Sequence, residues 1–124
     1  MWSYVDNNRM KKNRNVPIVL VVLVTCPSRA VARRIARTLV TRRLAACVNL
    51  LPGVESAFRW QGKVDQSREV LLLIKTTRRR FSSLAQALAR LHPYDVPEVI
   101  ALPVTAGAAP YLRWVARSVS ADRP

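Results

Sequence analysis

The chain has 124 residues, half of them hydrophobic, which suffices for one domain with a buried core and argues against intrinsic disorder. It contains 21 Lys and Arg against 7 Asp and Glu, a formal net charge of +14, so an anionic partner has to be considered. Two cysteines, Cys26 and Cys47, are too few for a disulfide scaffold. Free thiols in a reducing cytoplasm are the simpler interpretation.

The amino-terminal part divides into a polar segment and an apolar run. We expect residues 1–15 to form a mobile polar tail, followed by a single domain at 16–119 and a frayed tail at 120–124. The apolar run at 16–24 is rich in valine, which favours a central strand, and it is too short to span a membrane. Because basic residues precede it and Cys26 follows it, a lipoprotein anchored at Cys26 is a third-ranked interpretation.

A helix is predicted next, from about Ser28 to Thr41. Val31, Ile35 and Leu39 recur at helical spacing, and Ser28 is suited to cap the amino terminus. The arginines of this segment lie mostly outside the apolar stripe. The helix should therefore pack on the sheet and expose its basic side.

The stretch from Leu44 to Thr76 predicts a long antiparallel hairpin around a turn at Gln61-Gly62. Pro52-Gly53 predicts a kink or bulge in the outgoing strand. The return strand is apolar on both faces from Val70 to Ile74, so it should be covered on both sides. The tip carries Phe58 and Trp60, and such a surface on a projecting hairpin suggests that another subunit covers it.

The remaining elements complete the pattern. Thr76 or Thr77 can cap a helix that ends near His92. A strand follows at 99–104, and Pro103 places it at an edge of the sheet or puts the proline at the strand's end. Pro110 then opens a last helix. The order β-α-β-β-α-β with a terminal helix predicts an α+β protein: a ferredoxin-like βαββαβ sandwich with a C-terminal helix and a long projecting hairpin.

The residues give little support for catalysis, since no nucleophile lies beside a base in the sequence and no close pair of carboxylates stands out. His92, the only histidine, is either a metal ligand or a residue that caps the preceding helix, and the residues alone favour capping. Cys47 is by default a small buried side chain. Glu69 and Lys75 lie an even number of residues apart on one strand, so both should point to the same face.

Several short segments, in this order and spacing, resemble the CutA divalent-cation tolerance family over residues 16–118. The most specific is His-Pro-Tyr-Asp-Val-Pro-Glu at 92–98; the others include Thr-Cys-Pro at 25–27, Leu-Ala-Ala-Cys at 44–47, Trp-Gln-Gly-Lys at 60–63 and Tyr-Leu-Arg-Trp at 111–114. The resemblance implies a ferredoxin-like, non-enzymatic, cytoplasmic protein, without a membrane partner, that forms a tight homotrimer with hairpins pairing across subunits.

The resemblance also implies a link to copper or other divalent cations and a functional surface in the clefts between subunits. The metal candidates are His92 and Cys47, whereas Val24 and Leu91 stand where one bacterial version of the site has a Cys and a His. The residues expected to bind a ligand in the clefts are Trp60, Glu69, Lys75, Tyr94, Glu98, Tyr111 and Trp114.

A second interpretation, prompted by the charge, is a nucleic-acid-binding module on the same fold. Ferredoxin-like RNA binders present aromatic side chains on the open face of the sheet, and this chain has leucines there. The arginines are spread along the whole sequence, so we favour scattered solvated charges over a binding patch, and any binding of nucleic acid would be non-specific.

Overall fold

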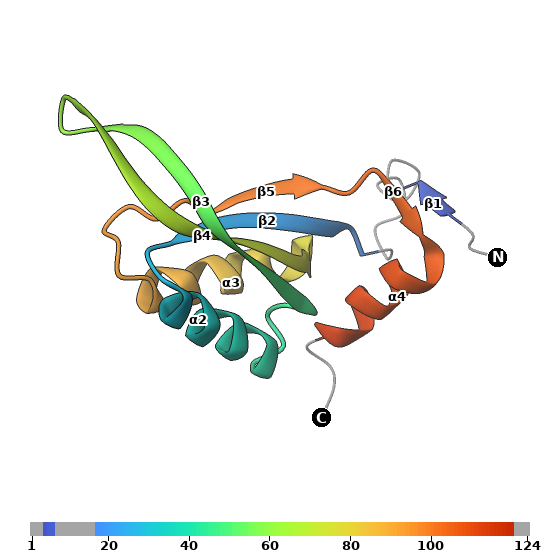
Figure 1. The fold of residues 1–124 in the computed structure, drawn as a ribbon. Coiled ribbons are helices and arrows are strands. Elements are labelled where there is room, and N and C mark those ends of the chain that lie inside the picture. Colours follow the sequence, from blue (N-terminus) through green and yellow to red (C-terminus); the bar gives the residue numbers. More distant parts are fainter. Residues whose placement is uncertain (1–3, 7–16, 121–124) are drawn as a thin grey trace.

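The computed structural model describes residues 4–6 and 17–120, and its centre is a four-stranded antiparallel sheet with two helices on one face (Figure 1). The order of the strands is β3-β4-β2-β5. The elements of this sandwich are β2 (Val19–Cys26), α2 (Arg29–Thr41), β3 (Cys47–Trp60), β4 (Lys63–Thr77), α3 (Arg78–Leu91) and β5 (Ile100–Pro103). This is the ferredoxin-like arrangement that the sequence predicts, and β5 lies at the predicted edge.

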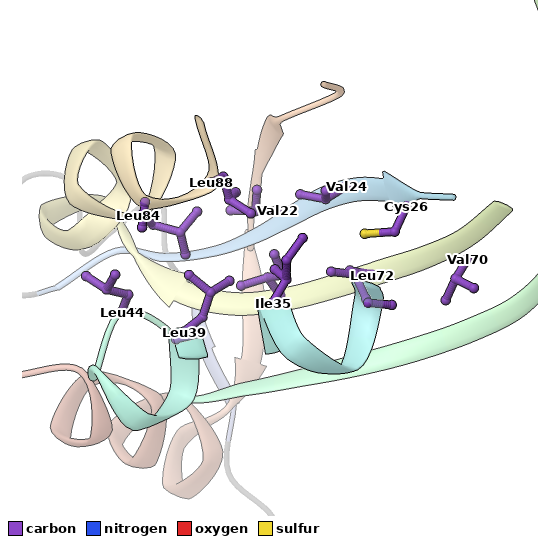
Figure 2. Packing of buried hydrophobic residues seen from close by; sticks show 14 residues of the cluster. Val22, Val24, Cys26, Ile35, Leu39, Leu44, Val70, Leu72, Leu84 and Leu88 are labelled. Atoms are coloured by element: carbon purple, nitrogen blue, oxygen red, sulfur yellow. The ribbon is translucent and has the colours of Figure 1, made fainter. Parts of the chain in front are cut away.

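The core lies between the sheet and the two helices. Alternate residues of β2 and β4 point toward the helices, and Val22, Val24 and Leu72 are completely buried. These side chains form one cluster with Ile35 of α2 and Leu84 of α3 (Figure 2). Every second side chain of these strands thus contacts the apolar stripes of the two helices.

The two helices begin differently. The Ser28 hydroxyl accepts a hydrogen bond from the Val31 N–H at 3.2 Å, so the predicted cap of α2 is confirmed. Thr77 occupies the cap position of α3 without a capping hydrogen bond from its side chain. The neighbouring Thr76 hydroxyl is completely buried and donates to the Leu44 carbonyl at 2.7 Å, so it joins β4 to the segment before β3.

The hairpin formed by β3 and β4 extends well beyond the helices (Figure 1). Its register shifts between Leu51 and Val54, where Gly53 has φ +78°, so the predicted bulge is confirmed. The turn is formed by Gln61 and Gly62, both with positive φ, a geometry typical of tight hairpin turns.

No helix of the described residues covers the opposite face of the sheet, because both connecting helices lie on the same side (Figure 1). Within a single subunit the helices therefore cover only one face of the return strand, and the predicted cover of the other face stays a prediction. Leu71 and Leu73 of β4 are only half-buried, and Ile100 and Leu102 of β5 are 51% and 50% exposed. We call this apolar surface the open face, and we include Leu23 of β2, which pairs with Leu73 and Ile100.

The last helix, α4 (Ala109–Ser118), has Pro110 in its first turn as predicted. It lies at one end of the sheet (Figure 1), where Leu112 and Val115 form a second small core with Val19. No helix in the described parts of the chain is both long and apolar enough to cross a membrane.

A second sheet consists of β1 (Tyr4–Asp6) and β6 (Ala106–Ala108), which pair antiparallel. The sequence predicts neither strand: each has only three residues, and Ala-Gly-Ala in β6 lacks the β-branched residues that favour strands. Within the predicted tail at 1–15, the backbone of Tyr4–Asp6 pairs with β6. The rest of that range, and residues 121–124 of the predicted frayed tail, lie outside the described residues.

Candidate functional site

His92 follows α3 and is buried, with both ring nitrogens hydrogen-bonded. Tyr94 donates its backbone N–H to Nδ1 at 3.1 Å, so Nε2 carries the proton and donates to the Thr25 carbonyl at 2.7 Å. The backbone N–H of His92 donates to the Leu88 carbonyl and ends the helix. The capping prediction is therefore right for the backbone but wrong for the ring, which joins the end of β2 to the segment after α3.

Tyr94 and Glu69 form the polar centre of the same region. The Tyr94 hydroxyl donates to Glu69 Oε2 at 2.8 Å, and the Glu69 side chain is only 8% exposed. Burial, this hydrogen bond and the charges of Glu69 and Cys26 raise the pKa of Tyr94 to about 12. Burial, together with the smaller effect of the nearby negative charge of Glu69, raises the pKa of the Cys26 thiol to about 11. At neutral pH the phenol is therefore a steady donor to the carboxylate.

An open cleft of about 880 Å³ lies beside this centre, between the outer hairpin and the segment 93–98. Four of the predicted ligand-binding residues line it: Trp60, Glu69, Tyr94 and Glu98. Three further carboxylates line it as well: Glu55, Asp65 and Asp95. The cleft is thus strongly acidic in a chain whose net charge is +14.

The other predicted residues meet at the far end of the sheet. Cys47 Sγ and the Tyr111 hydroxyl share a hydrogen bond of 3.4 Å, and the centroids of the Tyr111 and Trp114 rings are 5.5 Å apart. Burial and the contact with Cys47 raise the pKa of Tyr111 to about 12. Lys75, the cross-strand partner of Cys47, donates to the Asn49 side chain and to the Leu73 carbonyl.

The two groups are well separated within one chain. Glu69 and Lys75 point to the same face of β4 as predicted, but they are six residues apart, which corresponds to about 20 Å along a strand. One group, which we call the acidic cleft, contains Trp60, Glu69, Tyr94 and Glu98. The other, which we call the Cys47 cluster, contains Cys47, Lys75, Tyr111 and Trp114.

The predicted metal ligands do not fit a metal within one subunit. His92 belongs to the region of the acidic cleft and uses both nitrogens for hydrogen bonds, whereas Cys47 lies at the other end of the sheet. In the described parts of the chain, no three His, Cys, Asp or Glu side chains are grouped so that they could hold a metal ion. Lipid attachment at Cys26 does not fit this fold either, because the side chain is completely buried in the central strand β2.

Sequence reasoning missed three features of these sites. It did not predict that the Thr25 carbonyl accepts from His92, that Tyr111 bonds to Cys47, or that Glu55, Asp65 and Asp95 join the acidic cleft. The position of Asp65 could have been found from the hairpin register, because Asp65 pairs with Phe58 across the turn at Gln61-Gly62. The other two contacts join residues more than 60 positions apart and leave no local signal.

Comparisons with known proteins give a consistent result. A family model described as "CutA1 divalent ion tolerance protein" matches residues 20–118. The divalent-cation tolerance protein CutA of Thermus thermophilus is 54% identical over 95 residues, covering 77% of this chain and 92% of that protein. Protein CutA of mouse is 50% identical over 97 residues, covering 78% of this chain but only 55% of its own length. The solved structure of the Thermus thermophilus protein superimposes with a TM-score of 0.81 at 50% identity, covering 82% of this chain and 99% of that one.

Proposed function

The chain belongs to the CutA1 divalent ion tolerance protein family, and we propose that it acts in divalent-cation tolerance as a non-enzymatic homotrimer. In this proposal the subunits meet through the open face, and the acidic cleft of each subunit is the ligand-binding surface. The observation that carries the proposal is the open face itself, an apolar sheet surface that a single subunit leaves in contact with water.

The open face has the composition of an interface. Leu71 and Leu73 lie beside Leu23, and Ile100 and Leu102 extend the same surface to the edge strand. Soluble monomers rarely expose contiguous apolar patches of this kind, and apolar burial contributes about 25 cal/mol per Å². The exposed Phe58 and Trp60 on the projecting hairpin add a second apolar surface that a neighbouring subunit would cover.

Trimer formation would also bring the two groups of predicted residues into one site. The acidic cleft lies beside the projecting hairpin, whereas the Cys47 cluster lies at the opposite end of the sheet. We propose that the Cys47 cluster of one subunit, with Lys75, Tyr111 and Trp114, faces the acidic cleft of its neighbour. The shared site would combine carboxylates, one lysine and several aromatic rings, a mixture suited to a small polar ligand.

The metal link is proposed at the level of the assembled protein. Because both ring nitrogens of His92 are already hydrogen-bonded within its own subunit, a copper site in the assembled protein would have to use Cys47 together with ligands from other subunits. The five carboxylates of the acidic cleft would in addition attract divalent cations electrostatically.

The absence of enzymatic activity and the cytoplasmic location are parts of the same proposal. The Cys47 thiol contacts the Tyr111 hydroxyl, and a phenol whose pKa is raised to about 12 does not act as a base at neutral pH. The structure has both cysteines as free thiols, which suits a reducing compartment.

Native mass spectrometry of the reduced protein, alone and titrated with copper, tests the proposal. We expect the mass of three chains and uptake of copper in a defined ratio to the trimer. A trimer that ignores copper would retain the assembly and exclude the copper site, whereas a stable monomer would contradict the whole proposal.

A pair of variants tests whether the open face is the interface. Leu73→Glu places a carboxylate on the open face and should dissociate the trimer, because an unpaired buried charge costs several kcal/mol. Val40→Glu introduces the same charge on the exposed side of α2, where Val40 is 42% exposed, and should leave the trimer intact. If Leu73→Glu remains a trimer, the interface lies elsewhere.

A further inference from the structure

Ten of the sixteen Lys and Arg residues in the described parts of the chain lie on the layer formed by the two helices and the turn after α2. Arginines that the sequence analysis treated as scattered gather on α2, on α3 and on the turn after α2. They are Arg29, Arg33, Arg34, Arg37, Arg42, Arg43, Arg78, Arg79, Arg80 and Arg90. We call this surface the arginine layer. All of these residues except the half-buried Arg80 are exposed.

The arginine layer has no acidic residue of its own. Neither α2 nor α3 contains Asp or Glu, and the five carboxylates whose side chains the structure describes all line the acidic cleft. All the described carboxylates thus line the cleft beside the hairpin, which also carries Arg59, Lys63 and Arg68, whereas the helical layer carries arginines without any carboxylate among them. A surface of one sign that is not neutralised by its neighbours attracts polyanions over a distance of about 10 Å at 0.1 M salt.

The two helices present these charges together. Arg29, Arg33 and Arg37 are four residues apart, so they form a row along the outer side of α2 with steps of about 6 Å. At one end of the layer the Arg80 guanidinium Nε–H donates to the Arg43 carbonyl at 3.3 Å. This bond joins the first turn of α3 to the turn after α2, and it brings the two sets of arginines into one surface.

We propose that the arginine layer binds the phosphate backbone of double-stranded nucleic acid, without regard to base sequence. Arginine forms paired hydrogen bonds with phosphate oxygens, and a duplex carries one charge per about 1.7 Å of its axis. A row of arginines about 12 Å long therefore faces several phosphates at once. This surface is distinct from the open face and the acidic cleft, so the inference does not depend on the function proposed above.

The side chains on the layer favour a duplex over two other polyanions. Single strands are held by stacking on exposed aromatic rings, and the only ring on these helices, Phe81, is half-buried against the core. Membrane surfaces bind helices that insert apolar side chains, but α2 and α3 turn their apolar stripes into the core. Val40 is the only large hydrophobic side chain exposed on the described helical layer.

Fluorescence anisotropy of a labelled 20-base-pair DNA duplex tests this inference at several salt concentrations. If about six phosphates are bound, affinity should fall about 10³-fold between 50 and 200 mM salt. One triple variant, R33Q/R34Q/R37Q, removes three charges from the layer. A matched variant, R59Q/K63Q/R68Q, removes three exposed charges from the hairpin.

We expect the layer variant to weaken duplex binding at 50 mM salt by about tenfold or more, and to lower the salt slope by about 0.9 for each phosphate that the protein no longer neutralises. The hairpin variant should bind nearly as well as the unaltered protein. Equal weakening in both variants would show that net charge alone acts and would overturn the proposal. Binding to phosphatidylserine vesicles without binding to the duplex would overturn it as well.

Amide hydrogen exchange of the unaltered protein provides a second measurement that does not depend on how the variants fold. Addition of the duplex should slow exchange in segments 29–43 and 78–91. Protection confined to the hairpin or to the open face would contradict the assignment of the binding surface.

Discussion

The clearest single test of the described structure is the removal of the His92 ring. The ring donates to the Thr25 carbonyl and accepts from the Tyr94 N–H, and His92 is 6% exposed. His92→Ala removes both hydrogen bonds at once. The backbone bond from His92 to Leu88, which ends α3, is unaffected by the change of side chain.

The magnitude follows from the two backbone groups that lose their partners. A buried polar group left without a hydrogen bond costs about 1–3 kcal/mol, so two such groups give about 2–6 kcal/mol. Because Thr25 and Tyr94 are only half-buried, water can reach them in part. We therefore expect His92→Ala to lower the free energy of unfolding by about 2–4 kcal/mol.

Two conservative variants provide matched controls. In His92→Gln the side-chain amide can reach the position of Nε2 and donate to Thr25, whereas in His92→Asn the carbonyl can take the position of Nδ1 and accept from Tyr94. Each variant keeps one of the two hydrogen bonds. Each should therefore lose about half as much stability as His92→Ala.

The assay is urea unfolding followed by tryptophan fluorescence. Protein concentration has to be the same for all variants, because assembly contributes to apparent stability. The slopes of the unfolding curves should agree, so that the differences report the folded state. A free energy of unfolding for His92→Ala within about 0.5 kcal/mol of that of the unaltered protein would refute this reasoning, as would a His92→Ala variant that is more stable than both control variants. Either result would mean that the two hydrogen bonds do not hold the end of β2 to the segment after α3.

Three further changes follow from the same structure. The free energy of unfolding should fall as pH rises above 9, because the Cys26 thiol ionises near its ordinary pKa of 9.0 in the unfolded chain but only near 11 in the folded protein. Urea titrations between pH 8 and 10 should show a smaller fall for Cys26→Ala. Thr76→Val should cost about 1–3 kcal/mol in urea unfolding, since it leaves the Leu44 carbonyl without its buried donor, and a cost near zero would contradict this hydrogen bond. Gly62→Ala should cost about 1–2 kcal/mol in the same assay, because φ is +79°, a backbone conformation that alanine adopts only with strain. Nothing crowds an added methyl group, so the whole cost comes from the backbone, and equal stability of the variant would contradict this strain.

The sequence by itself determined the elements and their order. The short valine- and leucine-rich runs in residues 19–26 and 70–77, the helical stripes beginning at Val31 and Phe81, and the glycines at 53 and 62 are local patterns, and each one directs a local backbone geometry. It also carried the family resemblance, because the short motifs keep their order along the chain. The strands β1 and β6 were missed because each has only three residues and their pairing joins segments about 100 positions apart; Ala-Gly-Ala in β6 in addition gives no local preference for a strand.

Only the tertiary structure decided which residues meet. Glu69 and Tyr94 are 25 positions apart and His92 and Thr25 are 67 positions apart, and they come together because β2 and β4 are paired and α3 returns the chain to the same end of the sheet. The same topology divides the predicted site residues between two ends of β4 and gathers the arginines of both helices on one face. Periodicity is a property of neighbours along the chain, whereas a site depends on the path of the backbone between its parts. That path is set by the packing of the whole core.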